Sequence, residues 1–227
     1  IIIAAVCGYL AGHLGTSVAF SRAGLVVVGV MVVAGVLGFL DDIISIRRGR
    51  NRGLNKRAKF IGQLAIGGTF AYVAVAWVHT STTLSFTRFD FPGWELGAIG
   101  WSLLAVFMLT ATSNAVNLTD GLDGLAAGSS TFCFGVLSII GYWQFRHSFS
   151  QNLYNLPAAL DLALVAVALV GGCLGFLWWN AAPARIIMGD TGSLSIGASL
   201  AALCVFMNLD LLLVIIGGLF VVETVSV

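Results

Sequence analysis

The chain has 227 residues, of which 59% are hydrophobic and only 9% are charged. Soluble proteins average roughly 45–50% apolar and about 25% charged residues, so this chain lacks the polar surface that a water-soluble globule needs. The net charge of +1 also excludes nucleic-acid binding driven by bulk positive charge. We therefore expect an all-α polytopic membrane protein that lies in a lipid bilayer and binds no nucleic acid.

Alternating apolar and polar segments predict about eight transmembrane helices. In chain order we place them at residues 1–14, 23–43, 58–78, 97–116, 124–142, 158–179, 192–207 and 211–227. Because the chain begins and ends within apolar runs, we interpret residues 1–227 as a single transmembrane domain truncated at both ends. The four cysteines are isolated in apolar runs, which is typical of buried residues and not of a disulfide framework.

The charged residues are distributed unevenly between the two predicted faces. Eight of the eleven basic residues fall on one of the two predicted membrane faces, most of them in the segment 44–57. Basic loops resist translocation, so we assign this side to the cytoplasm. Helix parity places five of the ten acidic residues on the same side, and it places all three histidines on the other. The five acidic residues are Asp41, Asp42, Asp120, Asp123 and Asp190.

The first acidic motif is Asp41-Asp42, at the end of the second predicted helix. Two adjacent carboxylates repel each other, and the negative end of the helix dipole disfavours both by about 0.3–1 kcal/mol. A metal ion or the following basic segment is needed to offset this charge. The functional hypothesis is a cation or phosphate site, and the structural alternative is a solvated helix end paired with arginines.

The second motif runs from Asn114 to Gly124 between two apolar segments. It contains Asp120 and Asp123, two amides and two glycines. Carboxylate and amide oxygens are the ligands that hard cations such as Mg²⁺ prefer, and glycines let a backbone approach a ligand closely. A simple helix cap would need only one polar residue, so this stretch favours a binding site.

The third motif runs from Asn180 to Ser193 and contains Pro183 and the turn Gly189-Asp190-Thr191-Gly192-Ser193. A glycine turn that enters a helix offers free backbone N–H groups and a positive dipole end to a phosphate. An aspartate among phosphate-binding groups is explained if it holds Mg²⁺. The alternative is that Asp190 only caps the helix.

Lys59 and Gln63 lie four residues apart at the start of the third predicted helix and therefore share one face. Both could point toward the same pocket as Asp41. The rest of the basic segment is expected to anchor the chain at anionic lipids.

These motifs carry a family resemblance. Asp41-Asp42, Lys59, Gln63 and the run from Asn117 to Ala126 resemble the polyprenyl-phosphate N-acetylhexosamine-1-phosphate transferase superfamily. Segments 176–184, 188–193 and 220–227 are most similar to its phospho-N-acetylmuramoyl-pentapeptide transferase branch. The resemblance implies a bacterial inner-membrane protein of ten helices with a cytoplasmic active site. It also implies Mg²⁺-dependent transfer from UDP-N-acetylmuramoyl-pentapeptide to undecaprenyl phosphate, which yields lipid I and UMP for peptidoglycan synthesis.

Residue roles follow from the same resemblance, motif by motif. The implied catalytic residues are Asp41, Asp42, Asp120 and Asp190, and the implied metal ligands are Asp190, Asn117 and Asp120. The implied substrate-binding residues are Lys59, Asn117, Gly121, Leu122, Asp123, Asn180, Ile187, Gly189 and Ser193. Ile187 occupies a position where the family commonly has Phe. Isoleucine has no aromatic ring, so stacking on uracil is not expected at this position. A homodimer is compatible with the sequence, which leaves the oligomeric state open.

Two other functions are considered. A sibling enzyme would transfer N-acetylglucosamine-1-phosphate from UDP-N-acetylglucosamine to the same lipid. The residues Asn117-Leu118-Thr119 and the C-terminal segment 220–227 argue against this enzyme. An ion-coupled transporter would also cluster carboxylates in a membrane. Transporters usually place such groups near the midplane, whereas these map to one membrane edge.

Overall fold

The computed structural model describes residues 1–16, 18–48, 53–151 and 158–226. Within these ranges six helices are long and apolar enough to cross a membrane, in agreement with the expected all-α polytopic architecture. They are α2 (Arg22–Arg48), α3 (Lys56–Val73), which continues as the π-helical turn η1 (Ala74–Val78), α4 (Gly97–Thr119), α5 (Leu125–Gln151), α6 (Ala159–Asn180) and α7 (Gly189–Phe206).

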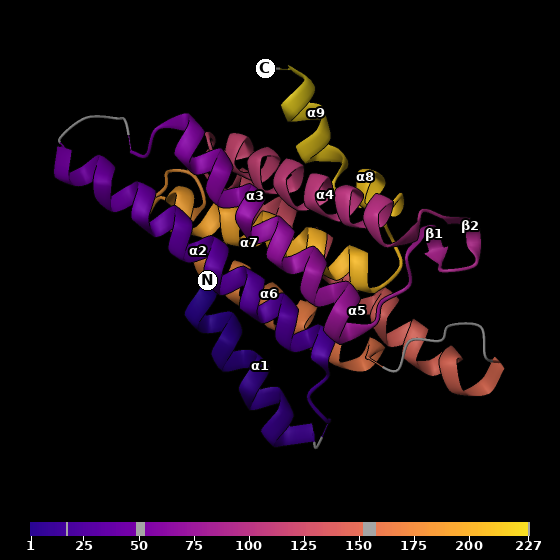
Figure 1. Cartoon of the computed structure of the whole chain (residues 1–227). Coiled ribbons are helices and arrows are strands. Elements are labelled where there is room, and N and C mark those ends of the chain that lie inside the picture. The colour runs from indigo at the N-terminus through magenta and orange to yellow at the C-terminus, as the bar shows by residue number, and fades with distance from the viewer. Residues whose placement is uncertain (17, 49–52, 152–157, 227) are drawn as a thin grey trace.

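The two ends of the chain differ in detail from the predicted spans. Helix α1 (Ile2–Thr16) is apolar but only 15 residues long. The last predicted span is divided at Gly217 into α8 (Leu212–Ile216) and α9 (Gly218–Ser226). Two consecutive glycines interrupt the helix there, since glycine is among the poorest helix formers. Figure 1 shows α9 projecting from the bundle with the C-terminus at its tip.

A short β-hairpin lies in the segment that sequence reasoning treated only as a polar gap. Strands β1 (Thr83–Arg88) and β2 (Phe91–Glu95) pair antiparallel, with Thr83 opposite Glu95. β1 alternates threonine and serine with apolar residues, a period-two pattern that marks a strand even where mean hydropathy is low. The hairpin lies at one end of the bundle, and the C-terminal end of α2 and the start of α3 lie at the other (Figure 1).

Helix α7 is the central element of the bundle. It is the most enclosed of the six long helices and packs chiefly against α2 and α4 (Figure 1). Small residues allow this close packing: a Cβ added to Gly197 would lie 2.5 Å from the Cα of Ser113 on α4. Lipid tails are as apolar as leucine, so helices in a bilayer associate through such close contacts and not through hydrophobic burial.

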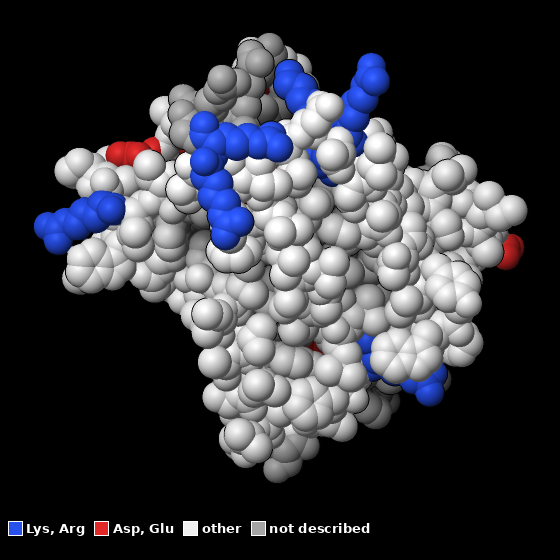
Figure 2. Space-filling model, turned by 60° about the vertical axis from the view of Figure 1, so that its left-hand side comes forward, with Lys and Arg blue, Asp and Glu red and all other residues white. Residues whose placement is uncertain are grey.

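Among the residues that the structure describes, charged side chains lie near the ends of the helices or in the segments between them. Arg47, Arg48, Lys56 and Arg57 are exposed around the α2–α3 connection. Figure 2 shows most of the basic side chains in view at the top and left of the molecule and others at the lower right, with a broad uncharged surface between them. This uncharged surface is what a helix bundle presents to lipid tails.

The end that carries the hairpin contains a buried polar cluster that sequence reasoning missed. Asp161, at the start of α6, accepts hydrogen bonds from the Ser21 hydroxyl (2.5 Å) and the Tyr9 hydroxyl (3.2 Å). The His13 Nε2 atom lies 2.9 Å from its other oxygen. Asp161 thereby joins α1, the start of α2 and α6. The prediction that the histidines are remote from the acidic motifs holds for His13, whose role here is structural.

Asp210, which follows α7, links the hairpin to this end of the helix through hydrogen bonds. The Ser85 N–H and hydroxyl both donate to its Oδ2 atom, at 3.1 and 2.6 Å, and the Leu211 N–H donates to the Ser85 carbonyl at 3.0 Å. Its Oδ1 atom is buried and has no hydrogen-bond partner among the residues that the structure describes. Burial raises the pKa of Asp210 from 3.8 to about 6, against the opposing effect of the Ser85 donors.

We expect the Asp210→Asn substitution to change how stability depends on pH. Because the pKa of Asp210 is raised by folding, its contribution to stability is present below about pH 4 and is lost as the pH rises through about 6. Asparagine does not titrate. The free energy of unfolding of the variant should therefore increase relative to that of the parent by about 1–3 kcal/mol as the pH rises from about 4 to about 6. Melting temperatures from pH 4.5 to 7.5 measure the effect. Exposed Asp90 provides the control as Asp90→Asn; parallel curves for D210N and parent would contradict the expectation.

Candidate active site

Four helix ends meet at the end of the bundle away from the hairpin. The C-terminal end of α2 lies against the N-terminal turn of α7, and the start of α3 and the end of α4 complete the group (Figure 1). The close approach of α2 to α7 depends on Gly38, because a Cβ there would overlap the backbone of Asp190 and Thr191. Sequence parity predicted this convergence of the three acidic motifs.

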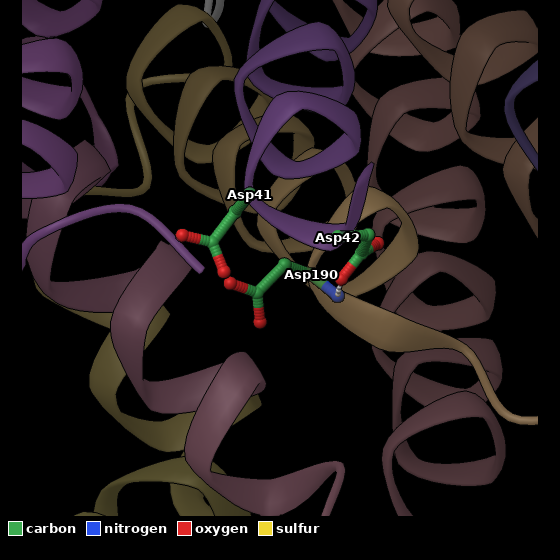
Figure 3. Close-up of side chains that lie close together, drawn as sticks. All are labelled: Asp41, Asp42 and Asp190. Atoms are coloured by element: carbon green, nitrogen blue, oxygen red, sulfur yellow. Dashed lines mark hydrogen bonds between the residues drawn. The ribbon is translucent and has the colours of Figure 1, made fainter. Parts of the chain in front are cut away.

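Asp41, Asp42 and Asp190 form a carboxylate cluster at this point (Figure 3). One oxygen from each side chain lies within 4.8 Å of the others, and all three residues are half-buried. Three carboxylates this close repel one another strongly unless a cation neutralises them. Their hard oxygen donors and spacing fit a divalent metal ion such as Mg²⁺ or Mn²⁺.

Asp41 and Asp190 are each held by a neighbouring group. The Leu54 N–H donates to the Asp41 Oδ1 atom at 2.7 Å, which brings the chain before α3 over the end of α2. Gly53 permits this approach, since a Cβ there would lie 2.5 Å from an Asp41 carboxylate oxygen. The Lys59 ammonium forms an ion pair with the Asp190 Oδ2 atom. A cationic side chain thus already faces the cluster.

Asn117 connects α4 to the same group. Its Nδ2 atom donates to the Asp190 Oδ1 atom at 2.6 Å and to the Ser193 hydroxyl at 2.8 Å. Its Oδ1 atom lies 3.5 Å from the Lys59 ammonium. The structure therefore brings together Lys59, Asn117, Asp190 and Ser193, which the sequence had singled out from three separate motifs.

Gln63 does not join the carboxylates, although it shares a helix face with Lys59. It is buried and forms a reciprocal amide pair with Asn114: Asn114 Nδ2 donates to Gln63 Oε1 at 2.9 Å, and Gln63 Nε2 donates back at 3.3 Å. This pair links α3 to α4 beside the contacts of Lys59 and Asn117. Sequence reasoning included Asn114 in the second motif but assigned it no role.

Asp120 lies outside the carboxylate group but close enough to interact with it electrostatically. It follows the last residue of α4. Burial raises the pKa of Asp120 to about 6, and the neighbouring Asp190 carboxylate adds to the increase. Its assignment as a catalytic and metal-binding residue therefore stays a proposal.

The loops after α4 and α6 are hydrogen-bonded to each other. The Gly124 N–H donates to the Asn180 Oδ1 atom at 3.1 Å, and the Asn180 Nδ2 atom donates to the Ile186 carbonyl at 2.9 Å. The Ala184 N–H donates to Asp123 at 2.9 Å. Gly124 adopts a φ of +75°, which a residue with a Cβ rarely tolerates. These bonds join the two loops into a rim beside the carboxylates.

The remaining predicted substrate-binding residues lie around this rim. Leu122 and Ile187 expose their side chains, and Gly121 is also exposed. Gly189 adopts a φ of +63° at the first position of α7, directly before Asp190. Exposed apolar side chains beside fixed polar groups suit an aromatic or apolar part of a ligand. Sequence reasoning missed Thr191 and the Leu54 N–H; the glycine-flanked turn was the signal for Thr191.

The fold and site define a polytopic helical membrane protein with a cluster of three carboxylates, Asp41, Asp42 and Asp190, at one end of its bundle that could hold a metal ion. Residues 24–208 match the sequence family described as glycosyl transferase family 4. The chain belongs to this family.

Several curated relatives carry the same name. The phospho-N-acetylmuramoyl-pentapeptide-transferase of Frankia casuarinae is 48% identical over 238 residues, covering all of this chain and 66% of that protein. The Streptomyces coelicolor protein of that name is 50% identical over 218 residues, covering 90% of this chain and 60% of its own length. The Salinispora arenicola protein is 41% identical and is covered to 68%. This chain thus spans about two thirds of the length of these relatives.

Proposed function

We propose that the protein transfers phospho-N-acetylmuramoyl-pentapeptide from its UDP conjugate to undecaprenyl phosphate, forming lipid I and UMP. The observation that carries the proposal is the convergence of Asp41, Asp190, Lys59 and Asn117 at one end of a membrane bundle. Relatives that share this chain's full extent bear the corresponding name.

The reaction requires charge neutralisation and in-line positioning more than covalent chemistry by the protein. An oxygen of the lipid phosphate attacks the phosphorus attached to the sugar, and the bond from that phosphorus to UMP breaks. Asp41 is placed to orient the attacking phosphate or accept its proton, because its half-buried carboxylate lies beside that of Asp190. Lys59 supplies positive charge to the diphosphate. We favour direct attack over an aspartyl-phosphate route because a phosphate dianion is already nucleophilic.

The carboxylate cluster would hold Mg²⁺ through Asp190 and Asp41, with Asp120 and Asn117 beside it. When bound, Mg²⁺ neutralises the charge of the diphosphate and of the departing UMP. The rim formed by Asn180, Asp123 and the exposed Ile187 would receive the uridine. Backbone N–H groups and side chains held by mutual hydrogen bonds orient such a ligand at little entropic cost.

The site would face the cytoplasm of a bacterial inner membrane. The basic side chains around the α2–α3 connection lie at the same end of the bundle as the carboxylates, and basic segments stay on the cytoplasmic side. A nucleotide-linked sugar is made in the cytoplasm, whereas the lipid carrier lies in the membrane. A site at the membrane edge is accessible to both.

The proposal is tested by UMP release from two donor substrates. The whole purified protein, with undecaprenyl phosphate and Mg²⁺ in detergent micelles, should release UMP from UDP-N-acetylmuramoyl-pentapeptide. With UDP-N-acetylglucosamine we expect a kcat/KM lower by at least about 100-fold, the discrimination that several lost polar contacts produce. Equal or greater activity with UDP-N-acetylglucosamine would assign the protein to the sibling reaction. Substrate flux across proteoliposomes without UMP release would indicate a transporter.

A further inference from the structure

The adjacent carboxylates of Asp41 and Asp42 point in different directions. Figure 3 shows the side chain of Asp41 directed toward the carboxylate of Asp190, whereas Asp42 turns to the backbone nitrogen of Asp190. Adjacent residues on a helix are about 100° apart around its axis, so the two side chains cannot face one ligand in the same way. The two aspartates of this motif therefore have different surroundings.

Both oxygens of Asp42 are occupied by the first turn of α7. Its Oδ1 atom accepts from the Asp190 N–H at 3.2 Å. Its Oδ2 atom accepts from the Thr191 N–H at 3.0 Å and from the Thr191 hydroxyl at 2.6 Å. Three donors from two consecutive residues thus converge on one carboxylate.

This arrangement supplies a cap that α7 lacks in its own sequence. Met188 occupies the N-cap position and makes no side-chain capping hydrogen bond. The first N–H groups of any helix have no intrahelical partner and need an acceptor from elsewhere. Asp42, on α2, is that acceptor, and a negative charge is favourable at the positive end of the helix dipole.

The cap determines where the Asp190 carboxylate lies. Asp190 is the second residue of α7, and its own N–H is one of the groups that Asp42 binds. The preceding Gly189 has a φ of +63°, and a Cβ there would lie 2.9 Å from the Asp42 Oδ2 atom. Asp42 therefore sits directly against the turn that directs the Asp190 side chain toward Asp41.

We propose that Asp42 is a positioning residue and that Asp41 and Asp190, without Asp42, hold the divalent cation. Asp42 keeps the first turn of α7 in place, so that the Asp190 carboxylate faces Asp41 beside Lys59. The role in catalysis rests on the proposed function. The cation-binding part can be measured without any UDP-sugar or lipid, so the two can fail separately.

The test is Mn²⁺ binding to the whole protein in detergent micelles, measured by electron paramagnetic resonance without substrate. We expect Asp190→Asn and Asp41→Asn to weaken Mn²⁺ binding by at least about 10-fold, since each removes an anionic ligand. Asp42→Asn should stay within about threefold of the parent. Its Oδ1 atom can still accept from the Asp190 N–H, and its amide can donate to the Thr191 hydroxyl, so that only the Thr191 N–H loses its acceptor.

Two further variants separate positioning from mere structural support. Asp42→Ala removes all three acceptor contacts and should weaken Mn²⁺ binding about 10-fold, with rescue by Asp42→Asn. Thr191→Val removes only the hydroxyl donor and should lower the Mn²⁺ affinity about two- to threefold. The series therefore stays informative even if Asp42→Ala does not fold. Melting temperatures are recorded for every variant.

Several outcomes would overturn the proposal. Loss of Mn²⁺ by Asp42→Asn equal to that by Asp190→Asn would make Asp42 a metal ligand. Unchanged Mn²⁺ affinity in Asp42→Ala with only a lower melting temperature would leave Asp42 a purely structural role. If the parent did not bind Mn²⁺, the carboxylates would not form a divalent-cation site, and the proposal would fail. If the series behaves as expected but the parent releases no UMP, the positioning role stands and the proposed function fails.

Discussion

Replacing Asp190 with asparagine is expected to lower kcat/KM for UMP release by about 10²–10³-fold, the range measured when a single group that stabilises transition-state charge is removed. The carboxylate of Asp190 is the acceptor for Lys59 and Asn117 and belongs to the carboxylate cluster. Its loss would remove the carboxylate that we propose as a metal ligand and would leave the Lys59 ammonium without its anionic partner. The measurement is UMP release at saturating Mg²⁺, with the melting temperature recorded in parallel.

Asp90→Asn is the matched control for this prediction. It makes the same chemical change at an exposed carboxylate on the hairpin, at the opposite end of the bundle, where the Arg88 Nε lies 3.1 Å away. Exposed ion pairs of this kind contribute little to stability, so the activity of Asp90→Asn should stay within about twofold of that of the parent. Activity of Asp190→Asn within fivefold of the parent would contradict a central role for this carboxylate.

The second large effect is expected from Gly38→Ala. A Cβ at this position would overlap the carbonyl of Asp190 and the nitrogen of Thr191, which are backbone atoms that no rotamer change can move. Helices α2 and α7 would have to separate, and the contacts between Asp42 and the first turn of α7 would break. Overpacking of this kind costs about 1–3 kcal/mol, and we expect a lower melting temperature together with loss of UMP release.

Gly29→Ala provides the control on the same helix. A Cβ at Gly29 would meet no atom of the described residues within 4 Å, so the added methyl group causes no overlap with them. Alanine forms helices more readily than glycine, by about 1 kcal/mol, so this variant should be as stable as the parent or slightly more stable. If Gly38→Ala and Gly29→Ala melted at the same temperature, the close approach of α2 to α7 would not be a constraint.

The convergence of the acidic motifs could be predicted because it depends only on the number of crossings. Apolar segments of membrane length must alternate between the two faces, so Asp41, Asp120 and Asp190 had to lie at the same end. The pairing of Lys59 with Asp190 was only partly predictable: helical spacing placed Lys59 and Gln63 on one face, but the structure pairs Gln63 with Asn114.

Other features required the fold itself. The hairpin lies in a stretch of mixed hydropathy, which a search for long apolar segments passes over. The cluster around Asp161 joins residues at least 140 positions apart, Tyr9 and Ser21 on one side and Asp161 on the other. Hydropathy records where a helix lies but not which residue of another helix its polar side chains meet.

The sequence alone determined that this protein is a membrane-embedded helix bundle with carboxylates and basic residues at one edge. Composition, segment length and parity suffice for that, because a bilayer permits few arrangements of the backbone. Only the tertiary structure decided which of the two neighbouring aspartates faces the carboxylate of Asp190 and which caps α7. That choice depends on the rotation of α2 about its axis against α7, and this rotation is set by contacts such as the one at Gly38, between residues far apart in the chain.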